Sequence, residues 1–417
     1  MAKNLILKCQ EIQEDTMSIN PLKEKGMPIE KQLRNWSDLN VKPYNKKEVH
    51  PYTRTRVILM NGIEVEGAIF THQFARHSDD MELKKKLAMA RRVEQQQQKA
   101  VNWLVPGNET VLEVTIGFEQ VAVDLTAFLA RNEPDPYVKA ALDFALLEDF
   151  DHLYRYANLM DMVQGNAADE VTKQFTEITV GRPTSAEHRH PFDEIRKHYD
   201  AQSADFLTKL HVLTIIAAEQ QTMNLYMNVG NRPEDQLGRG LYLEIAQIEE
   251  QHVTHYESLA DPRATWFEQL VLHEYNECWL YHSLTLDEPD QRIKKIWEMH
   301  LEMEIEHLQI ACELMKEHQK KDPEEMLPKT LPAPFRFESN IDYVRKIMAE
   351  QTDFNAMGTE FVPGDQLPKD SYYQKYQEMV NKGGVPSEQV IEAHVKEKGK
   401  EYRQELSGPH PIERFRK

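Results

Sequence analysis

Apart from Glu187 with His190 in a proline-containing loop, three pairs of side chains along the chain combine an acid with a histidine three residues later. These pairs are Asp149 with His152, Glu249 with His252, and Glu304 with His307. A lone glutamate stands 33 residues before each of these histidines, at Glu119, Glu219 and Glu274. In a helix, residues at positions i and i+3 project from the same face. Because carboxylates and imidazoles are protein ligands of iron and manganese, the recurring pattern predicts a metal site.

A long-range repeat connects these sets. An incomplete fourth set lies upstream, with Glu64, Glu94 and, in the place of the histidine, Gln97. Adding 155 to each residue number of the first half gives the second half, so that Glu64, Glu94, Gln97, Glu119, Asp149 and His152 correspond to Glu219, Glu249, His252, Glu274, Glu304 and His307. Two segments with the form of helix capping boxes, Thr110–Glu113 and Thr265–Glu268, share this offset. We infer an old internal duplication with four helices in each copy.

Long helices are expected to position the repeated residues. Glycine is scarce, with 16 residues in 417, and long segments consist of good helix formers. Strand-like alternation bounded by turns is rare. We therefore predict an all-α protein with helices at 55–77, 81–104, 110–131, 135–161, 205–229, 236–259, 265–286 and 290–319. The predicted domains are an N-terminal extension (1–53), a first four-helix bundle with a degenerate site (54–161), a linker (162–204), a second bundle with the metal site (205–320) and a C-terminal extension (321–417), both extensions being irregular.

Each lone glutamate stands 30 residues before the acid of the following pair, with a turn near the middle of the interval. Two antiparallel helical arms of about 10–15 residues, at a rise of about 1.5 Å per residue, bring both groups to the same level of a hairpin. Two such hairpins supply four carboxylates and two imidazoles to one interior. This is the ligand set of a di-iron or di-manganese carboxylate centre.

In these motifs the sequence resembles the ferritin-like di-iron carboxylate superfamily, which includes rubrerythrins, bacterioferritins and di-iron oxygenases. The resemblance covers about residues 54–319, and residues 219–307 hold the complete motif Glu…Glu-x-x-His…Glu…Glu-x-x-His. It implies two tandem ferritin-like bundles made of four helical hairpins, and a pair of Fe ions, or alternatively Mn or mixed Mn/Fe. Glu219 and Glu274 would be the lone carboxylates. The paired ligands would be Glu249 with His252 and Glu304 with His307.

Two groupings of the hairpins satisfy the pattern. The repeat favours residues 219–307 as one site. The topology usual in the resembling superfamily places a long crossover between the two hairpins, and the long connection here is 153–205. That topology favours a second grouping, which combines Glu119, Asp149 and His152 with Glu219, Glu249 and His252. We prefer the 219–307 grouping, because the other leaves the Glu304–His307 pair without a role.

The incomplete set of ligands suggests that the first bundle differs from the second in metal binding. Gln97 is a poorer ligand for iron or manganese than an imidazole, so a metal-free first bundle is favoured. Buried carboxylates without a metal would then need protons or cationic partners.

Several tyrosines lie on the ligand-bearing helix faces. Tyr226 and Tyr281 each follow a lone glutamate by seven residues, while Tyr156 and Tyr256 each follow a motif histidine by four. Tyr226, Tyr281 and Tyr256 are the candidate catalytic residues, because a tyrosine at a metal site can hydrogen-bond a ligand or carry redox chemistry. The alternative is that they are core aromatics with satisfied hydroxyl groups.

Composition limits the class of protein. The net charge of −19 disfavours nucleic acid and anionic membranes as partners. Cys9, Cys278 and Cys312 form no CxxC motif, which argues against a rubredoxin-type iron centre. No apolar run approaches the roughly 18 residues of a membrane span. The N-terminal stretch MAKNLILKCQEIQEDT lacks the ordered regions of a secretory signal, so a cytoplasmic protein is expected.

The expected function is that of an oxidoreductase or oxygenase that uses O2 or peroxide on a small-molecule substrate. Since the cysteines cannot hold an iron–sulfur or rubredoxin centre, reductant would come from a separate electron donor or from the substrate. A homodimer is compatible with these features. The alternative is a non-catalytic helical metal-binding or scaffold protein, in which the repeat reflects core packing.

Overall fold

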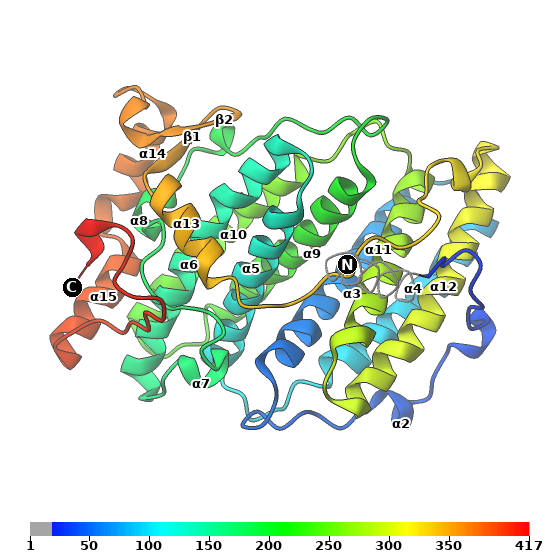
Figure 1. The fold of residues 1–417 in the computed structure, drawn as a ribbon, viewed down its shortest axis with the longest axis horizontal. Coiled ribbons are helices and arrows are strands. Elements are labelled where there is room, and N and C mark those ends of the chain that lie inside the picture. Colours follow the sequence, from blue (N-terminus) through cyan, green and yellow to red (C-terminus); the bar gives the residue numbers. More distant parts are fainter. Residues whose placement is uncertain (1–18, 417) are drawn as a thin grey trace, which may run out of the picture. The chain divides into compact units, whose positions relative to one another are not determined.

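The computed structural model describes residues 19–416, most of which are helical (Figure 1). The long helices are α3 (Pro51–Arg76), α4 (Met81–Asn102), α5 (Val111–Asn132), α6 (Pro136–Gln164), α9 (Phe206–Val229), α10 (Gln236–Glu257), α11 (Trp266–Asp287) and α12 (Gln291–Gln319). Each begins and ends within four residues of its predicted range, in agreement with the all-α prediction. The N-terminal stretch predicted to lack a secretory signal, with Cys9, lies outside the described residues.

Short elements connect and extend these helices. They are η1 (Ile29–Lys31), α2 (Trp36–Leu39), α7 (Asp169–Thr172), α8 (Thr184–Glu187), η2 (Pro191–Asp193), η3 (Pro323–Glu325), α13 (Ile341–Gln351), η4 (Gly364–Gln366), α14 (Tyr372–Val380), η5 (Asn381–Gly383), α15 (Pro386–Lys398) and η6 (Glu413–Phe415). The one sheet among the described residues is an antiparallel hairpin of β1 (Phe354–Met357) and β2 (Glu360–Pro363). Within the same residues, no helix combines the length and the apolar character needed to cross a bilayer.

Side-chain caps explain why two of the helices start where they do. Thr110 Oγ1 accepts a hydrogen bond from the Glu113 amide at 3.1 Å, and Glu113 Oε2 accepts one from the Thr110 amide at 2.7 Å. Thr265 and Glu268 form the same reciprocal pair at the start of α11. Both predicted capping boxes are therefore confirmed, one in each half of the repeat.

The chain forms two compact units, and neither is continuous in sequence. Unit 2 comprises residues 42–66, 101–262 and 337–417. In it α5 packs along α6 and α9 along α10, while α5 also contacts α9 and α6 contacts α10. These four helices, which can be followed in Figure 1, therefore surround a common interior.

The first part of α3 lies against α9 within unit 2. Gln221 Nε2 donates a hydrogen bond to the Ile58 carbonyl oxygen at 2.8 Å. Gly62 permits this close approach, because a Cβ atom at that position would lie 2.5 Å from Gln221 Cδ. The glycine is therefore explained by helix packing.

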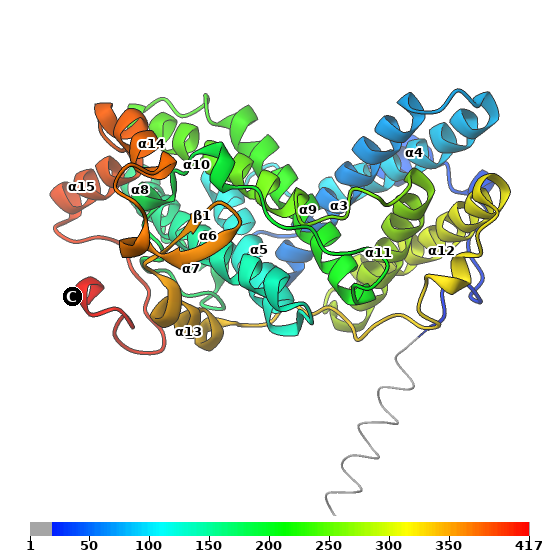
Figure 2. The same ribbon diagram turned by 90° about the horizontal axis from the view of Figure 1, so that it is seen from above.

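Among the described residues, unit 1 comprises 19–41, 67–100 and 263–336. In it α11 packs along α12, and the two helices run side by side in Figures 1 and 2. The end of α3 packs on α11 through the rings of Phe70 and His273, whose centroids are 4.1 Å apart. Gln97 Nε2 of α4 donates a hydrogen bond to Glu304 Oε1 of α12. Unit 1 thus combines α4, from the first half of the repeat, with α11 and α12, from the second half.

The two units do not follow the predicted domain boundaries. Residues 54–161 and 205–320 were expected to form one bundle each, in tandem. Instead α5 and α6 join α9 and α10, whereas α4 joins α11 and α12. The segment from Gly165 to Asp205, which contains only short helices, is the long connection between the second and third hairpins.

Two segments expected to be irregular are ordered parts of unit 2. In the C-terminal extension, α13 buries Val344, Ile347 and Met348 in a cluster with residues of α5 and α6, and α15 packs on α6 and α10. The predicted linker also contributes buried charged residues, described below. Short helices depend on tertiary packing more than on their own propensity, so their sequences carry a weak signal.

Candidate metal centre

Six of the nine predicted ligands meet inside unit 2. Helix α5 contributes Glu119, α6 contributes Asp149 and His152, α9 contributes Glu219, and α10 contributes Glu249 and His252. None of the six is more than 1% exposed. We call this set the unit 2 centre.

The ligand atoms of the unit 2 centre form two overlapping groups. In one group, Asp149, Glu219, Glu249 and His252 offer oxygen or nitrogen atoms that all lie within 4.8 Å of one another. In the other, Glu119, His152 and Glu249 satisfy the same limit. Glu249 belongs to both groups, so its carboxylate is placed to bridge two ion positions.

This arrangement is the grouping that family topology favoured, and it differs from the preferred 219–307 grouping. Glu274, Glu304 and His307 belong to unit 1, whereas Glu219, Glu249 and His252 belong to unit 2. The preference rested on giving the Glu304–His307 pair a partner hairpin, and in the structure that partner is α4, which carries Glu94 and Gln97.

Both imidazoles of the unit 2 centre are oriented by an outer carboxylate. His152 Nε2 lies 2.8 Å from Glu187 Oε2, and His252 Nε2 lies 2.9 Å from Glu148 Oε2. An ionised carboxylate only accepts hydrogen bonds, so His252 Nε2 donates to Glu148, and His152 Nε2 donates to Glu187 when that carboxylate is ionised. Nδ1 of each ring then faces the acids of the centre, the pattern by which outer carboxylates orient metal-binding histidines.

The inner distances agree with this orientation. His152 Nδ1 lies 3.1 Å from Glu249 Oε1, and His252 Nδ1 lies 3.2 Å from Asp149 Oδ1 and 3.6 Å from Glu249 Oε2. Burial opposes the charged form of each imidazole, yet the surrounding carboxylates raise the pKa of both histidines well above the usual value. The carboxylates of the unit 2 centre therefore favour a positive charge in the interior of the bundle.

The two outer carboxylates differ in their own partners. Glu148 is paired with Arg182 at 2.9 Å and with Arg189 at 2.5 Å. Although burial raises its pKa, Arg189, His252 and Arg182 hold the pKa of Glu148 well below its usual range. Burial instead raises the pKa of Glu187 to about 8, despite its contact with His152. The two histidines are thus supported by carboxylates of different basicity.

Sequence reasoning missed these supporting residues. Glu187 lies in α8 and Arg182 and Arg189 flank it, all within the segment predicted as a linker, and all three are buried. Glu148 directly precedes Asp149 but does not belong to the spacing pattern that predicts the metal ligands. The only feature of the sequence that could have indicated these residues is the run of charges in GRPTSAEHRH, in a loop with few apolar residues. It is typical of an exposed loop, and only the tertiary structure shows that it is buried.

The buried carboxylates of the unit 2 centre need positive charge that the protein does not fully supply. Among the described atoms, Glu119 Oε2, Asp149 Oδ2, Glu249 Oε2 and both carboxylate oxygens of Glu219 are buried without a hydrogen bond. Burial and neighbouring acids raise the pKa of Glu119 and Glu219 well above the usual value. Two divalent cations would balance the four carboxylates of the centre, so the residues fit such a pair.

The candidate catalytic tyrosines occupy different places. Tyr226 donates a hydrogen bond to Glu119 Oε1 at 2.5 Å, which places its hydroxyl group next to the unit 2 centre. Tyr256 is fully buried in the same unit, and its hydroxyl group has no hydrogen-bond partner among the described residues. Tyr281 lies in unit 1, where its hydroxyl group is 3.0 Å from His300 Nδ1. Tyr281 is therefore not part of the unit 2 centre.

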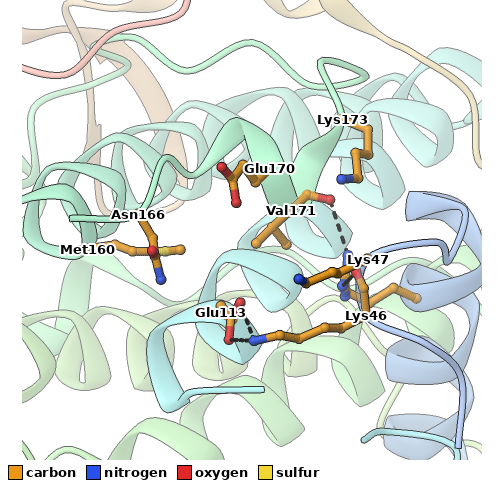
Figure 3. A pocket seen from close by; sticks show the side chains of 9 residues that line it. Lys46, Lys47, Glu113, Met160, Asn166, Glu170, Val171 and Lys173 are labelled. Atoms are coloured by element: carbon orange, nitrogen blue, oxygen red, sulfur yellow. Dashed lines mark hydrogen bonds and ion pairs between the residues drawn. The ribbon is translucent and has the colours of Figure 1, made fainter. Parts of the chain in front are cut away.

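The pocket of Figure 3, also in unit 2, has a volume of about 470 Å³ and contains none of the predicted ligands. Several cations line it, but Lys46 reaches Glu113 at 2.8 Å and Arg54 pairs with Glu109 at 2.9 Å. Met160 and Val171 form its apolar part, and both belong to the core cluster that also contains Tyr226.

Comparison with known proteins gives no match at any level: no family model, no curated protein and no solved structure matches this chain.

Proposed function

We propose that the unit 2 centre holds two Fe ions, or alternatively two Mn ions or one of each, and that the protein is an O2- or peroxide-dependent oxidoreductase acting on a small substrate. One observation carries the proposal. Two imidazole Nδ1 atoms and four carboxylates, one of them Glu249 at the centre, converge from four helices in a buried interior.

The residues of unit 2 would hold, orient and neutralise such a pair. Glu249 lies between the two histidines, while Glu119 serves one ion position and Asp149 and Glu219 serve the other. When bound, the ions would supply the two-electron chemistry needed to reduce O2 or peroxide. Tyr226 holds a proton at its hydroxyl oxygen, directed at Glu119 Oε1. The reductant would come from a separate electron donor or from the substrate.

We further propose that unit 2 has a ferritin-like fold and that unit 1 descends from the same ancestor by duplication. The capping boxes 155 residues apart, which form in both halves, support the duplication. In this proposal each unit combines hairpins from both halves of the repeat, since α5–α6 and α9–α10 come from different copies.

The experiment compares iron content and O2 consumption in matched variants. Wild-type protein loaded anaerobically with Fe2+ is expected to retain two ions in unit 2 and to consume O2 when mixed with aerated buffer. The double substitution Glu249→Gln and His252→Ala is expected to abolish both the retention of iron in unit 2 and the consumption of O2. Glu250→Gln, at an exposed neighbouring position on the same helix, serves as the control. Iron uptake by unit 2 unchanged in the double variant would refute the proposal.

The near-complete burial of the six residues also favours a second candidate, a non-catalytic metal-binding or scaffold protein. A buried ion pair without access for substrate would stabilise the fold without turnover. O2 consumption separates the two candidates. In a passive binder, the bound ions would raise the melting temperature of the protein. The reduced protein would not consume O2 catalytically, whichever electron donor is added.

A further inference from the structure

A second cluster of buried ligand-type side chains lies in unit 1. Glu94 of α4, Glu274 of α11 and His307 of α12 offer atoms that all lie within 4.8 Å of one another. Glu304 stands next to them, with Oε2 3.0 Å from His307 Nδ1. We call these four residues the unit 1 cluster, and none of them is more than 4% exposed.

The ring of His307 is oriented as a metal ligand would be. Its Nε2 lies 2.7 Å from Gln32 Oε1, while Gln32 Nε2 donates to the Met27 carbonyl oxygen at 2.6 Å. The second bond fixes which end of the Gln32 amide faces the ring, so His307 Nε2 is the donor. His307 Nδ1 therefore points toward Glu304 Oε2 at 3.0 Å and Glu274 Oε2 at 3.8 Å. The same orientation recurs at His152 and His252.

Three acceptor atoms at the cluster are buried without a hydrogen bond to any described residue: Glu94 Oε2, Gln97 Oε1 and Glu274 Oε2. Glu94 is 2% exposed and Gln97 is fully buried. Gln97 uses its amide nitrogen to donate to Glu304, which leaves its oxygen available. A buried acceptor without a donor is costly, and a cation would satisfy all three atoms.

The charges lead to the same conclusion. Glu94, Glu274 and Glu304 place three carboxylates together, and His307 is the cationic partner that Glu274 and Glu304 share. One divalent ion would offset most of this charge.

We propose that unit 1 binds a single divalent first-row cation, Mn2+ or Fe2+, through Glu94, Glu274 and His307, with Glu304 and Gln97 completing or orienting the set. One imidazole among several oxygen atoms suits these hard ions better than Cu2+ or Zn2+. Gln97 replaces the imidazole that a second ion would need, so the site takes one ion where the unit 2 centre takes two. This inference does not depend on the proposed function of unit 2.

The test uses Mn2+ alone, added to metal-free full-length protein that carries Glu249→Gln and His252→Ala, so that unit 1 is observed by itself. Bound Mn2+ is counted by mass spectrometry after gel filtration and followed by electron paramagnetic resonance. One ion per chain, with the signal of an isolated Mn2+, is expected. Adding His307→Ala or the near-isosteric Glu94→Gln is expected to weaken binding at least tenfold, whereas Glu302→Gln, at an exposed position on α12, is expected to have no effect.

The outcomes separate this proposal from the one for unit 2. If Mn2+ uptake in the background variant is unchanged by His307→Ala and by Glu94→Gln, the unit 1 site is refuted while the unit 2 centre is untouched. Gln97→His provides a test that does not depend on loss of binding, which poor folding of a variant could also cause, because this substitution adds a ligand. It is expected to bind Mn2+ about tenfold more tightly, and unchanged or weaker binding counts against the proposal.

Discussion

The rings of His152 and His252, 100 residues apart in the chain, face each other inside unit 2 with their centroids 5.9 Å apart. Glu249 reaches both, with one carboxylate oxygen 3.1 Å from His152 Nδ1 and the other 3.6 Å from His252 Nδ1. A single side chain therefore links the two halves of the unit 2 centre, and the halves differ in their remaining acids.

This geometry predicts unequal effects of single carboxylate substitutions. Glu249→Gln should lose both ions, because each ion position depends on that carboxylate. Glu119→Gln should weaken only the position at His152, and Glu219→Gln only the position at His252. Metal content per chain, measured after loading with Fe2+ under identical conditions, distinguishes these cases. Equal losses in all three variants would show that Glu249 does not bridge.

The two outer carboxylates predict different effects on stability, although each of them supports a histidine of the unit 2 centre. Glu148→Gln leaves Arg182 and Arg189 buried without their shared anion, so the free energy of unfolding should fall by about 3–5 kcal/mol. Glu187→Gln removes no arginine partner, but it weakens the support of His152 and should lower metal affinity roughly 10–100-fold.

Urea unfolding of the metal-free proteins and Mn2+ titration measure the two effects. Glu388→Gln is a suitable control, because Glu388 is also paired with an arginine, Arg155, but its side chain is 42% exposed. A Glu148→Gln variant as stable as the control would mean that the arginines find other partners.

Sequence periodicity was sufficient to predict the long helices of this chain and which acids and histidines lie together within one hairpin. The Glu-x-x-His spacing fixes a helix face, and the interval of 30 residues fixes the level within a hairpin, so the spacing alone predicts that Glu219, Glu249 and His252 lie together. Both relations are local to one hairpin. They depend on helix rise and on turn position, which composition and capping residues reveal.

The pairing of hairpins and the supporting network could not be predicted in the same way. Which hairpin faces α9 and α10 is decided by packing between segments far apart in the chain, and the repeat fits both groupings equally. Glu187 orients His152 from a segment whose sequence resembles an exposed loop. Its burial depends on contacts with α6 and α10 and with the C-terminal extension, such as the bond from Arg182 to the Gln351 carbonyl oxygen at 3.1 Å.

Two of the buried tyrosines of unit 2, Tyr226 and Tyr256, predict opposite responses to loss of the hydroxyl group. Tyr226→Phe removes the donor to Glu119 Oε1 and should cost about 1–3 kcal/mol in the metal-free protein, because a buried acceptor loses its partner. Tyr256→Phe should be neutral or slightly stabilising, since the Tyr256 hydroxyl group makes no hydrogen bond to any described residue. Denaturant midpoints of the two variants, compared with wild type, decide the point. Equal losses would indicate a partner for Tyr256, such as an ordered water.

A buried acid away from the metal ligands predicts a pH-dependent stability. Asp124 of α5 is 1% exposed and accepts a hydrogen bond from Thr176 Oγ1 at 2.7 Å. Burial raises the pKa of Asp124 to about 7, while the hydrogen bonds from Thr176 and Asn340 oppose the shift. The folded state therefore holds this proton more tightly than the unfolded state, whose pKa is near 3.8. The stability that Asp124 contributes is complete below about pH 4 and is lost as the pH rises through about 7.

Asp124→Asn removes this titration while keeping an acceptor for Thr176. Relative to wild type, the variant should gain about 2–4 kcal/mol in unfolding free energy between pH 4 and pH 8. Urea unfolding in the presence of a chelator measures the difference without interference from bound metal. Asp342→Asn changes the same charge at an exposed position and should show no such gain. A constant difference between Asp124→Asn and wild type across this range would mean that the Asp124 carboxylate is already ionised at low pH, held by its hydrogen bonds from Thr176 and Asn340.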